Sequence, residues 1–569
     1  MPSAPTNRPV IGSGCGLGAP GPSHLETWDS ANTTPEAVLP SEVAPAQLTF
    51  GHPELVPARR DESKDLHFSF SKSAPRRTHR SPSTPYWLLP IACLLISACK
   101  PVGPNYSKPA YNAPTTYKET GASTVVPPPN PPNGTWTPAN PSDGMLTGKW
   151  WQIYQDPALN KLEDRIATTN VQLKQALETY LAARDQVAVA RANFFPQVSA
   201  SASPQGEKYS ANEPLFNKAN VNSTVYSDYV IQGQATWEPD FWGRIRRTVE
   251  QARAGAQASA ADAAAVELTL EAEMATDYYA LRGLDSQIKL LTDTVTDLQN
   301  QLDLTQRRLT GGVATDVDVA QAQTELETVR AQLVDVGVAR AQFEHAIGTL
   351  ANYNLSDFSI PPSPLDLALP RIPTGVPSQL LERRPDIAAV ERQTAAANAQ
   401  IGIAVSAYYP TITLGASGGF QSTSLGTLIQ GPSSMWTLGG QAAELLFDAG
   451  QRHALTDQAR HTYEAQADGY RNTVFSAFED VEDQLAALRI LEQESVVEQR
   501  AVDAAQRSFD LSNKRYKGGV TSYLEVLTAE QTLLQDQVTA INIGSRQFAS
   551  SVSLIRALGG GWDVTQLPK

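Results

Sequence analysis

Two kinds of hydrophobic periodicity recur along this chain of 569 residues. In residues 198–203, Val and Ala alternate with Ser, and a similar alternation of apolar with small or polar residues returns at 229–237, 411–417 and 436–442. Because side chains two residues apart lie on one face of a strand, these stretches predict four strands with one apolar face and one small, polar face. Such strands suit a water-filled transmembrane β-barrel, and a soluble sandwich strand gives the same alternation.

A second period, with apolar residues three and four positions apart, follows the first pair of predicted strands. Its positions are Leu281, Leu284, Ile288, Leu291, Val295, Leu298 and Leu302, and then Val319, Ala322, Leu326, Val329, Leu333, Val336, Phe343, Ile347 and Leu350, broken only at Arg340. This spacing predicts a coiled-coil seam on both arms of a helical hairpin. The first arm, from Gly243 to the glycines at 311–312, is about 100 Å long at 1.5 Å per residue. No ordinary globular core needs helices of this length.

The turn between the two arms occurs twice in the chain. Residues 308–327 read RLTGGVATDVDVAQAQTELE, and residues 515–534 read RYKGGVTSYLEVLTAEQTLL. The two glycine pairs are expected to supply the left-handed positions that end a helix. Thr315-x-x-Asp318 and Ser522-x-x-Glu525 then have the spacing of a capping box at the start of the next helix. We therefore predict two hairpin tips per chain and two tandem structural repeats.

Composition argues against two broad functional classes. Charged residues make up 18% of the chain and the net charge is −14, whereas nucleic-acid binding needs a basic face. The sequence has no HExxH, paired CxxC, GxxxxGK[ST] or GxSxG motif, so we predict that the protein is not an enzyme. No motif indicates a cofactor or a bound metal.

The chain has three cysteines, and the last of them, Cys99, ends a segment with the pattern of a secretory signal. Basic residues at 76–80 precede a short apolar run at 87–96, which small residues separate from Cys99. Ile96-Ser97-Ala98-Cys99 resembles the bacterial lipobox, in which the cysteine becomes the lipidated first residue. In the lipoprotein pattern, Lys100 directly after the cysteine favours sorting of the protein to the outer membrane. The alternative interpretation is a buried thiol in an apolar strand.

These observations divide the chain into seven segments. They are an unstructured or wrongly annotated extension (1–75), a lipoprotein signal peptide (76–98), an acylated Pro-rich tether (99–148), a first repeat (149–352), a linker (353–374), a second repeat (375–562) and a C-terminal tail (563–569). Residues 1–75 are rich in Pro, Ser and Ala, and no Met occurs between Met1 and Met145. We therefore expect translation to start inside this stretch.

Seven short stretches, taken in order, resemble the TolC-type outer-membrane efflux channels, in particular their NodT-like lipoprotein branch. They are CKPVGPNY (99–106), WWQIYQDPAL (150–159), WEPDFWGR (237–244), LLERRPDI (380–387), LFDAG (446–450), AFEDVEDQLAAL (477–488) and ALGGGW (557–562). The resemblance implies a mixed α and β membrane protein, a homotrimer whose twelve-strand transmembrane β-barrel continues into a twelve-helix periplasmic α-barrel. It also implies a location in the outer membrane of a Gram-negative bacterium, reaching into the periplasm.

The resemblance further implies partners and site residues. The partners are a periplasmic adaptor, an RND-type inner-membrane transporter and outer-membrane lipid, with passive conduction of drugs or other small compounds once the adaptor opens the channel. The periplasmic gate of the family maps onto Tyr516, Thr521, Glu525 and Thr528. Thr521 stands where the family has a basic residue and Thr528 where it has an acidic one, so the family's ionic lock is incomplete here. The tips expected to contact the adaptor are Gly311, Gly312, Val313, Gly518, Gly519 and Val520.

Two other functions fit part of the sequence. A periplasmic adaptor is also often a lipoprotein with a coiled-coil hairpin, but it has one hairpin between β-rich halves. A structural coiled-coil lipoprotein without a pore leaves the duplicated alternating strands unexplained. The capping spacing at Ser522 also gives Glu525 a purely structural explanation, which is compatible with a role in a gate.

Overall fold

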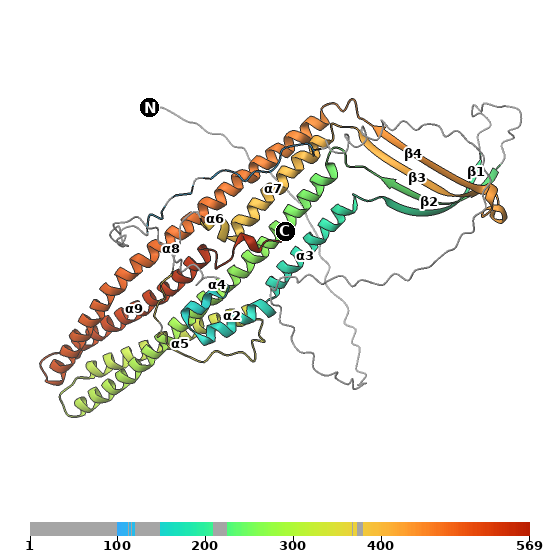
Figure 1. The fold of residues 1–569 in the computed structure, drawn as a ribbon. Helices are drawn as coiled ribbons and strands as arrows, with labels where there is room; N and C mark the ends of the chain where they lie inside the picture. Colours follow the sequence, from blue (N-terminus) through green and yellow to red (C-terminus); the bar gives the residue numbers. More distant parts are fainter. Residues whose placement is uncertain are drawn as a thin grey trace, which may run out of the picture. The chain divides into compact units, whose positions relative to one another are not determined.

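The computed structural model describes residues 100–111, 113–114, 116–119, 148–208, 225–366, 368–372 and 379–568, all of which lie in one compact unit, Pro85–Lys569. The predicted extension (1–75), the signal peptide (76–98), Cys99 and most of the tether therefore lie outside the described residues. Within the unit, helices and strands succeed one another in the order that Figure 1 shows.

The two halves of this unit contain similar elements in the same order. The first half has η2 (Trp150–Tyr154), α2 (Pro157–Thr169), α3 (Val171–Ala192), β1 (Gln197–Lys208), β2 (Val225–Trp237), α4 (Arg244–Thr310) and α5 (Asp316–Leu350). The second has α6 (Leu380–Arg383), α7 (Pro385–Ser406), β3 (Thr411–Ser422), η4 (Leu425–Thr427), η5 (Gly431–Ser433), β4 (Ser434–Ala443), α8 (Gln451–Lys517), α9 (Tyr523–Ala557) and η6 (Val564–Gln566). Both α4 and α8 have 67 residues, and both α5 and α9 have 35.

The four predicted strands are confirmed and form one antiparallel sheet in the order β1-β2-β3-β4. Its register keeps the sequence alternation in phase across the sheet. Val198, Ala235, Ala416 and Leu438 form one apolar row, Ala200, Gly233, Gly418 and Trp436 form the next, and Ser199, Gln234, Ser417 and Thr437 form a row on the other face. Trp436 and Leu438 are 79% and 75% exposed, so the apolar face is bare in a single chain.

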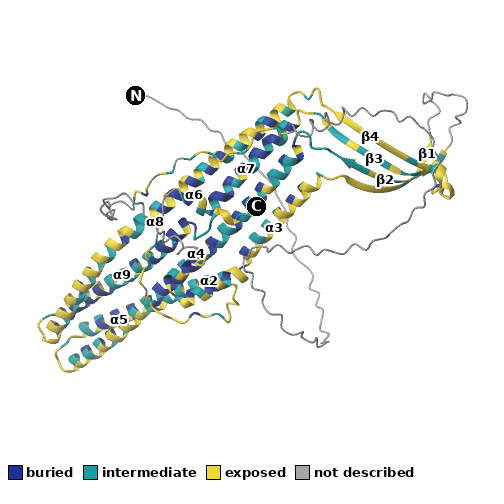
Figure 2. Ribbon diagram, in the orientation of Figure 1, coloured by how far each residue is buried: buried dark blue, intermediate teal, exposed yellow. Residues whose placement is uncertain are grey.

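The long helices form two hairpins, α4 with α5 and α8 with α9, and the hairpins touch where α4 packs along α9. The shorter helices lie beside them, α3 along α4, and α7 along both α4 and α8. Figure 2 shows that buried positions follow the facing sides of these helices, whereas the hairpin tips, β1 and β4 are largely exposed and β2 and β3 mix exposed with half-buried positions. The core of the helical part is therefore a set of narrow seams, as the three-four spacing predicts.

Arg340, which interrupts the predicted seam, has a buried partner. Its Nε donates to Asp285 Oδ1 at 2.7 Å, and Arg282 Nη1 donates to Asp285 Oδ2 at 3.0 Å. The backbone N–H of Ser363 also donates to Asp285, and Arg340 Nη2 donates to the carbonyl of Ile360. The Asp285 carboxylate, 0% exposed, therefore ties the segment after α5 to the first hairpin.

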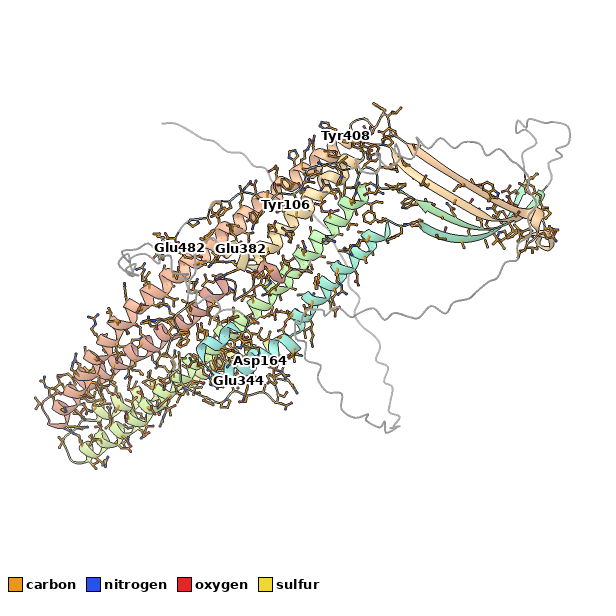
Figure 3. All side chains as sticks on the ribbon, in the orientation of Figure 1. Tyr106, Asp164, Glu344, Glu382, Tyr408 and Glu482 are labelled. Carbon is orange, nitrogen blue, oxygen red and sulfur yellow. The ribbon has the colours of Figure 1, made fainter. Side chains whose placement is uncertain are left out.

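The described part of the tether, residues 100–111, 113–114 and 116–119, runs against the helices. Tyr106 Oη donates to the Glu391 carboxylate on α7, and the Tyr111 ring stacks on Phe478 of α8. Further along, the backbone N–H groups of Lys118 and Glu119 donate to Glu482 on α8 at 2.7 and 3.0 Å. Figure 3 labels Tyr106 and Glu482, which lie at separate points along the helices. The described residues of the tether are thus held at Tyr106, Tyr111 and residues 118–119.

None of the helices in the described part of the chain is both long enough and apolar enough to cross a membrane.

Candidate gate and docking site at the hairpin tips

Each hairpin tip is closed by the same backbone hydrogen bonds. Val313 N–H donates to the carbonyl of Arg308 at 2.8 Å, and Gly312 N–H donates to that of Leu309 at 2.9 Å. In the second tip, Val520 and Gly519 donate in the same way to Arg515 and Tyr516. This pair of bonds is the Schellman motif, which satisfies carbonyls that the end of a helix leaves free.

Only the second glycine of each pair is left-handed, which corrects the expectation that both are. Gly312 has φ +74° and Gly519 has φ +71°, whereas Gly311 and Gly518 have φ −80° and −79°. The reason is that the Schellman motif needs a single left-handed residue after the helix, and the residue before it still has nearly helical geometry. A Cβ added at Gly312 or Gly519 would meet nothing within 4 Å, so both positions face open space.

The helices that follow the tips begin differently. At the first tip, Thr315 and Asp318 form the predicted capping box, with Asp318 N–H donating to Thr315 Oγ1 and Thr315 N–H donating to Asp318 Oδ2. The predicted box at Ser522 and Glu525 is wrong, because the Ser522 side chain accepts no capping bond. Ser522 is exposed, so water can take the place of this bond, and Glu525 is not held as a cap.

Both tips present an apolar surface to solvent. Val313 and Val520 are 68% and 69% exposed, and the residues one helical turn later, Val317 and Leu524, are 64% and 53% exposed. Each tip therefore carries a pair of exposed apolar side chains on its outermost turn. A surface of this kind suits contact with another protein more than contact with water.

The four predicted gate residues do not lie on one surface. Tyr516 is 6% exposed and packs against Tyr523, with ring centroids 5.4 Å apart, in a hydrophobic cluster that all four long helices share. Thr521 is half-buried, and its hydroxyl has no hydrogen-bond partner among the described residues. Glu525 and Thr528 instead line an open groove between α8 and α9, opposite Ser508 and Ser512 of α8.

Arg308, which sequence reasoning did not single out, joins the two tips. Its Nη1 donates to the carbonyl of Tyr516 at 3.1 Å, and its guanidinium carbon lies 4.4 Å from the centre of the Tyr516 ring. The only sequence signal that could have indicated this residue is its alignment with Arg515, which is exposed.

A buried carboxyl lies one to two turns into α9 from the second tip. Glu530 is 6% exposed and accepts a hydrogen bond from Gln301 of α4 at 3.0 Å. Burial raises the pKa of Glu530 to about 7, the Gln301 hydrogen bond opposes this rise, and the nearby carboxylates of Glu325 and Asp297 add to it. This carboxyl therefore titrates close to neutral pH between the two hairpins.

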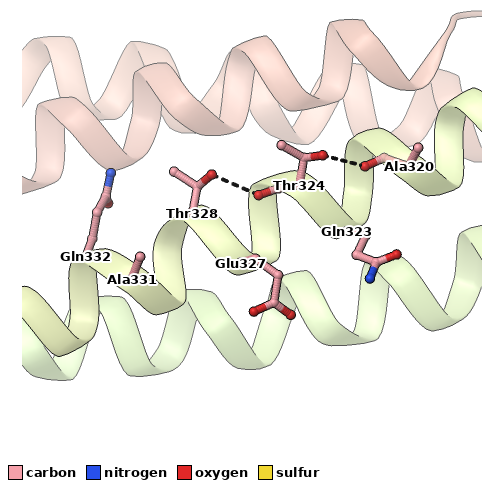
Figure 4. Close-up of a pocket in the computed structure, with 7 residues that line it drawn as sticks. All are labelled: Ala320, Gln323, Thr324, Glu327, Thr328, Ala331 and Gln332. Carbon is pink, nitrogen blue, oxygen red and sulfur yellow. Dashed lines mark hydrogen bonds between the residues drawn. The ribbon is translucent and has the colours of Figure 1, made fainter.

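The outer face of α5 is a shallow groove of small and polar side chains, shown in Figure 4. Thr324 and Thr328 direct their hydroxyls to the carbonyls one turn earlier, at Ala320 and Thr324, both at 2.8 Å. Their methyl groups and Ala331 leave a narrow surface that another helix can approach closely. The described residues contain no group of His, Cys, Asp or Glu arranged to hold a metal ion.

Two long helical hairpins that continue into a four-stranded sheet with one apolar face define an outer-membrane channel protein. The outer membrane efflux protein family matches residues 163–352 and 376–560, and this chain belongs to that family. The probable efflux pump outer membrane protein TtgC of Pseudomonas putida is 31% identical over 434 residues, covering 76% of this chain and 89% of TtgC.

Two further relatives agree with this assignment. The pyoverdine export outer membrane protein OpmQ of Pseudomonas aeruginosa is 29% identical over 426 residues, which are 74% of this chain and 90% of OpmQ. The solved structure of the outer-membrane channel OprN superimposes with a TM-score of 0.73 at 25% identity, covering 81% of this chain and 99% of OprN. The protein is thus an outer-membrane channel component of an efflux system, with its helices in the periplasm. The family decides against an adaptor and a coiled-coil lipoprotein without a pore.

Proposed function

We propose that three copies of this chain form a passive conduit, which carries drugs or other small compounds from the periplasm to the exterior. Each copy contributes two tandem repeats, 149–352 and 375–562, joined by the linker 353–374. The family match in two segments, 163–352 and 376–560, supports this division. The protein performs no chemical step, and the energy for transport comes from an inner-membrane transporter.

The observation that carries the proposal is the sheet, with its matched apolar face and its two open edges. Within the described residues, β1 and β4 each have a single neighbouring strand. Unpaired backbone groups at an edge cannot remain in a lipid bilayer, because no water is present to satisfy them. Pairing β1 of one copy with β4 of the next removes every edge, and three copies then supply a closed barrel of twelve strands.

In the same arrangement of three copies, the helical hairpins surround a tunnel. Three copies bring together twelve long helices, and the small side chains on the outer face of α5 in Figure 4 permit close contact with a helix of the neighbouring copy. The polar sheet face, with Ser199, Gln234 and Thr437, then lines the interior. Most groups on this face are uncharged hydrogen-bonding groups, which impose little selectivity on cargo, and Glu207 and Asp228 on the same face add negative charge.

We place the periplasmic gate at the second tip, with Glu525 and Thr528 in the groove and Tyr516 and Thr521 behind them. In a trimer, three Glu525 carboxylates surround the axis and favour cations by simple charge. Because no capping bond holds Glu525, its side chain is free to face the pore. The closed state relies on the Glu525 side chain and on packing around it, since Thr521 cannot form an ionic contact.

Cys99 is the proposed site of lipid attachment. The chain directly after it is fixed, because Val102 N–H donates to the carbonyl of Trp242 at 3.0 Å and Pro101 packs against Gly243. A Cβ added at Gly243 would come within 2.4 Å of Pro101 Cβ. This contact lies between the end of β2 and the start of α4, where the barrel meets the helices, so a lipid at Cys99 can reach the inner leaflet of the outer membrane.

The exposed apolar side chains at the hairpin tips are the proposed contact surface for the partner proteins. A periplasmic adaptor, itself joined to an RND-type transporter, covers the exposed apolar side chains around Gly311, Gly312 and Val313 and around Gly518, Gly519 and Val520. Binding there opens the channel by moving the hairpins apart.

Replacing Gly519 by aspartate is expected to abolish dye efflux and to weaken adaptor binding at least about tenfold, because a charge is forced into an apolar contact. Nothing lies within 4 Å of the new Cβ, and Asp tolerates a positive φ, so the trimer is expected to form. The measurements are dye accumulation in cells, co-purification of the adaptor and the mass of the purified oligomer.

Gly519→Asn is the matched control, because it has the same size and backbone tolerance without the charge. We expect it to retain most of the binding. Loss of the trimer in Gly519→Asp would show a folding defect instead, and normal efflux with normal adaptor binding would contradict the docking role of the tips.

A further inference from the structure

We propose that Arg308 is the residue that holds the gate closed, by fastening the first hairpin tip to the second. The inference rests on the proposed gate and deepens it. In this proposal Arg308, on the first tip, supplies the positively charged side chain that Thr521 cannot supply on the second tip.

The two tips carry arginines at equivalent positions, yet their environments differ. Arg308 and Arg515 each accept the Val N–H that closes their own turn, so their backbones have the same role. The Arg308 side chain is half-buried and crosses to the other hairpin, whereas that of Arg515 is exposed. The local fold of a tip therefore does not require the contact that Arg308 makes.

The chemistry of the contact is specific for a guanidinium. The last carbonyls of α8 are its negative end, and Arg308 Nη1 lies 3.1 Å from the carbonyl of Tyr516 and 3.5 Å from that of Lys517. The flat guanidinium also covers the Tyr516 ring, 4.4 Å from its centre. A lysine can replace the charge and the donor, but not the planar stacking.

Tyr516 depends on this contact, because its own hydroxyl makes no hydrogen bond among the described residues. Its ring is positioned by Tyr523 on one side and by Arg308 from the first hairpin. Movement of the two hairpin tips away from each other must break the Arg308 contact. An adaptor that opens the channel therefore has to break the contact between Arg308 and Tyr516.

The test compares Arg308→Ala, Arg308→Lys and Arg515→Ala in the full-length protein, with two measurements. Hydrogen exchange of peptides covering residues 514–523 reports how firmly the second tip is held, whether or not the protein conducts. Single-channel current without an adaptor reports the gate. In Arg308→Ala we expect exchange about tenfold faster, as for the loss of one charge-assisted hydrogen bond, and a larger resting current.

Arg308→Lys is expected to lie between Arg308→Ala and wild type, and Arg515→Ala to match wild type in both measurements. Equal exchange rates in Arg308→Ala and Arg515→Ala would contradict the claim that Arg308 holds the two tips together. Faster exchange in Arg308→Ala with an unchanged resting current would overturn its role in the gate. Faster exchange in Arg308→Ala, with no current from any variant even after the adaptor is bound, would support the contact and contradict the conduit itself.

Discussion

Replacing Asp285 by alanine is expected to lower the free energy of unfolding of the helical part by about 3–5 kcal/mol, the usual cost of breaking a buried ion pair. The substitution leaves the buried guanidinium groups of Arg282 and Arg340 without their shared carboxylate. It also removes the acceptor of the Ser363 N–H, so the segment after α5 loses its attachment. Denaturant unfolding followed by the helical circular dichroism signal measures the change.

Asp293→Ala is the control, because it removes a salt bridge from the same helix at the surface. Asp293 pairs with Lys289 at 2.9 Å, and both side chains are more than 60% exposed. A pair of this kind contributes less than about 1 kcal/mol. Equal effects of the two substitutions would show that the Asp285 network does not anchor the hairpin.

The second tip is expected to loosen as the pH rises from about 5 to above 7. An acid whose pKa is higher in the folded state stabilises that state while it is protonated, and this contribution is lost as the pH rises through the folded pKa. For Glu530, the shift from 4.5 to about 7 corresponds to about 3 kcal/mol at alkaline pH. Hydrogen exchange of peptides at the tip, measured across this range, detects the change.

Glu530→Gln keeps the shape of the protonated side chain, and should make the protection of the tip nearly independent of pH once the exchange rates are divided by the intrinsic, base-catalysed rates. Glu492→Gln, at an exposed position of α8, is the control and should leave the wild-type pH profile unchanged. An identical pH profile in wild type and Glu530→Gln would contradict the role given to this carboxyl.

The sheet and the hairpins were predictable because their signals are local. A period of two or of three to four residues can be read within one stretch, and the duplicated glycine turn fixes where each hairpin ends. The register across the sheet then follows, since matching the apolar faces leaves few alternatives. The pattern therefore predicted the strands and the hairpins, and the family resemblance was needed to predict an outer-membrane channel.

The contacts of the site were not predictable, because they join residues far apart in the sequence. Arg308 meets Tyr516 across 208 positions, and Asp285 meets Arg340 across 55. Glu530 has no sequence signal of its own, because its burial depends on the packing of the two hairpins. The predicted cap at Ser522 failed for the opposite reason: correct local spacing does not ensure that an exposed side chain closes the bond.

The most direct test of the conduit is the single-channel current of the purified trimer in a planar bilayer, for wild type and for Glu525→Ala. We expect small, cation-selective currents from the wild type. The variant should show larger currents or weaker selectivity, because the ring of carboxylates is gone. Currents of the same size and selectivity in wild type and Glu525→Ala would show that Glu525 is not part of the gate. No current from a folded trimer of either form, even with the adaptor bound at its tips, would contradict the conduit.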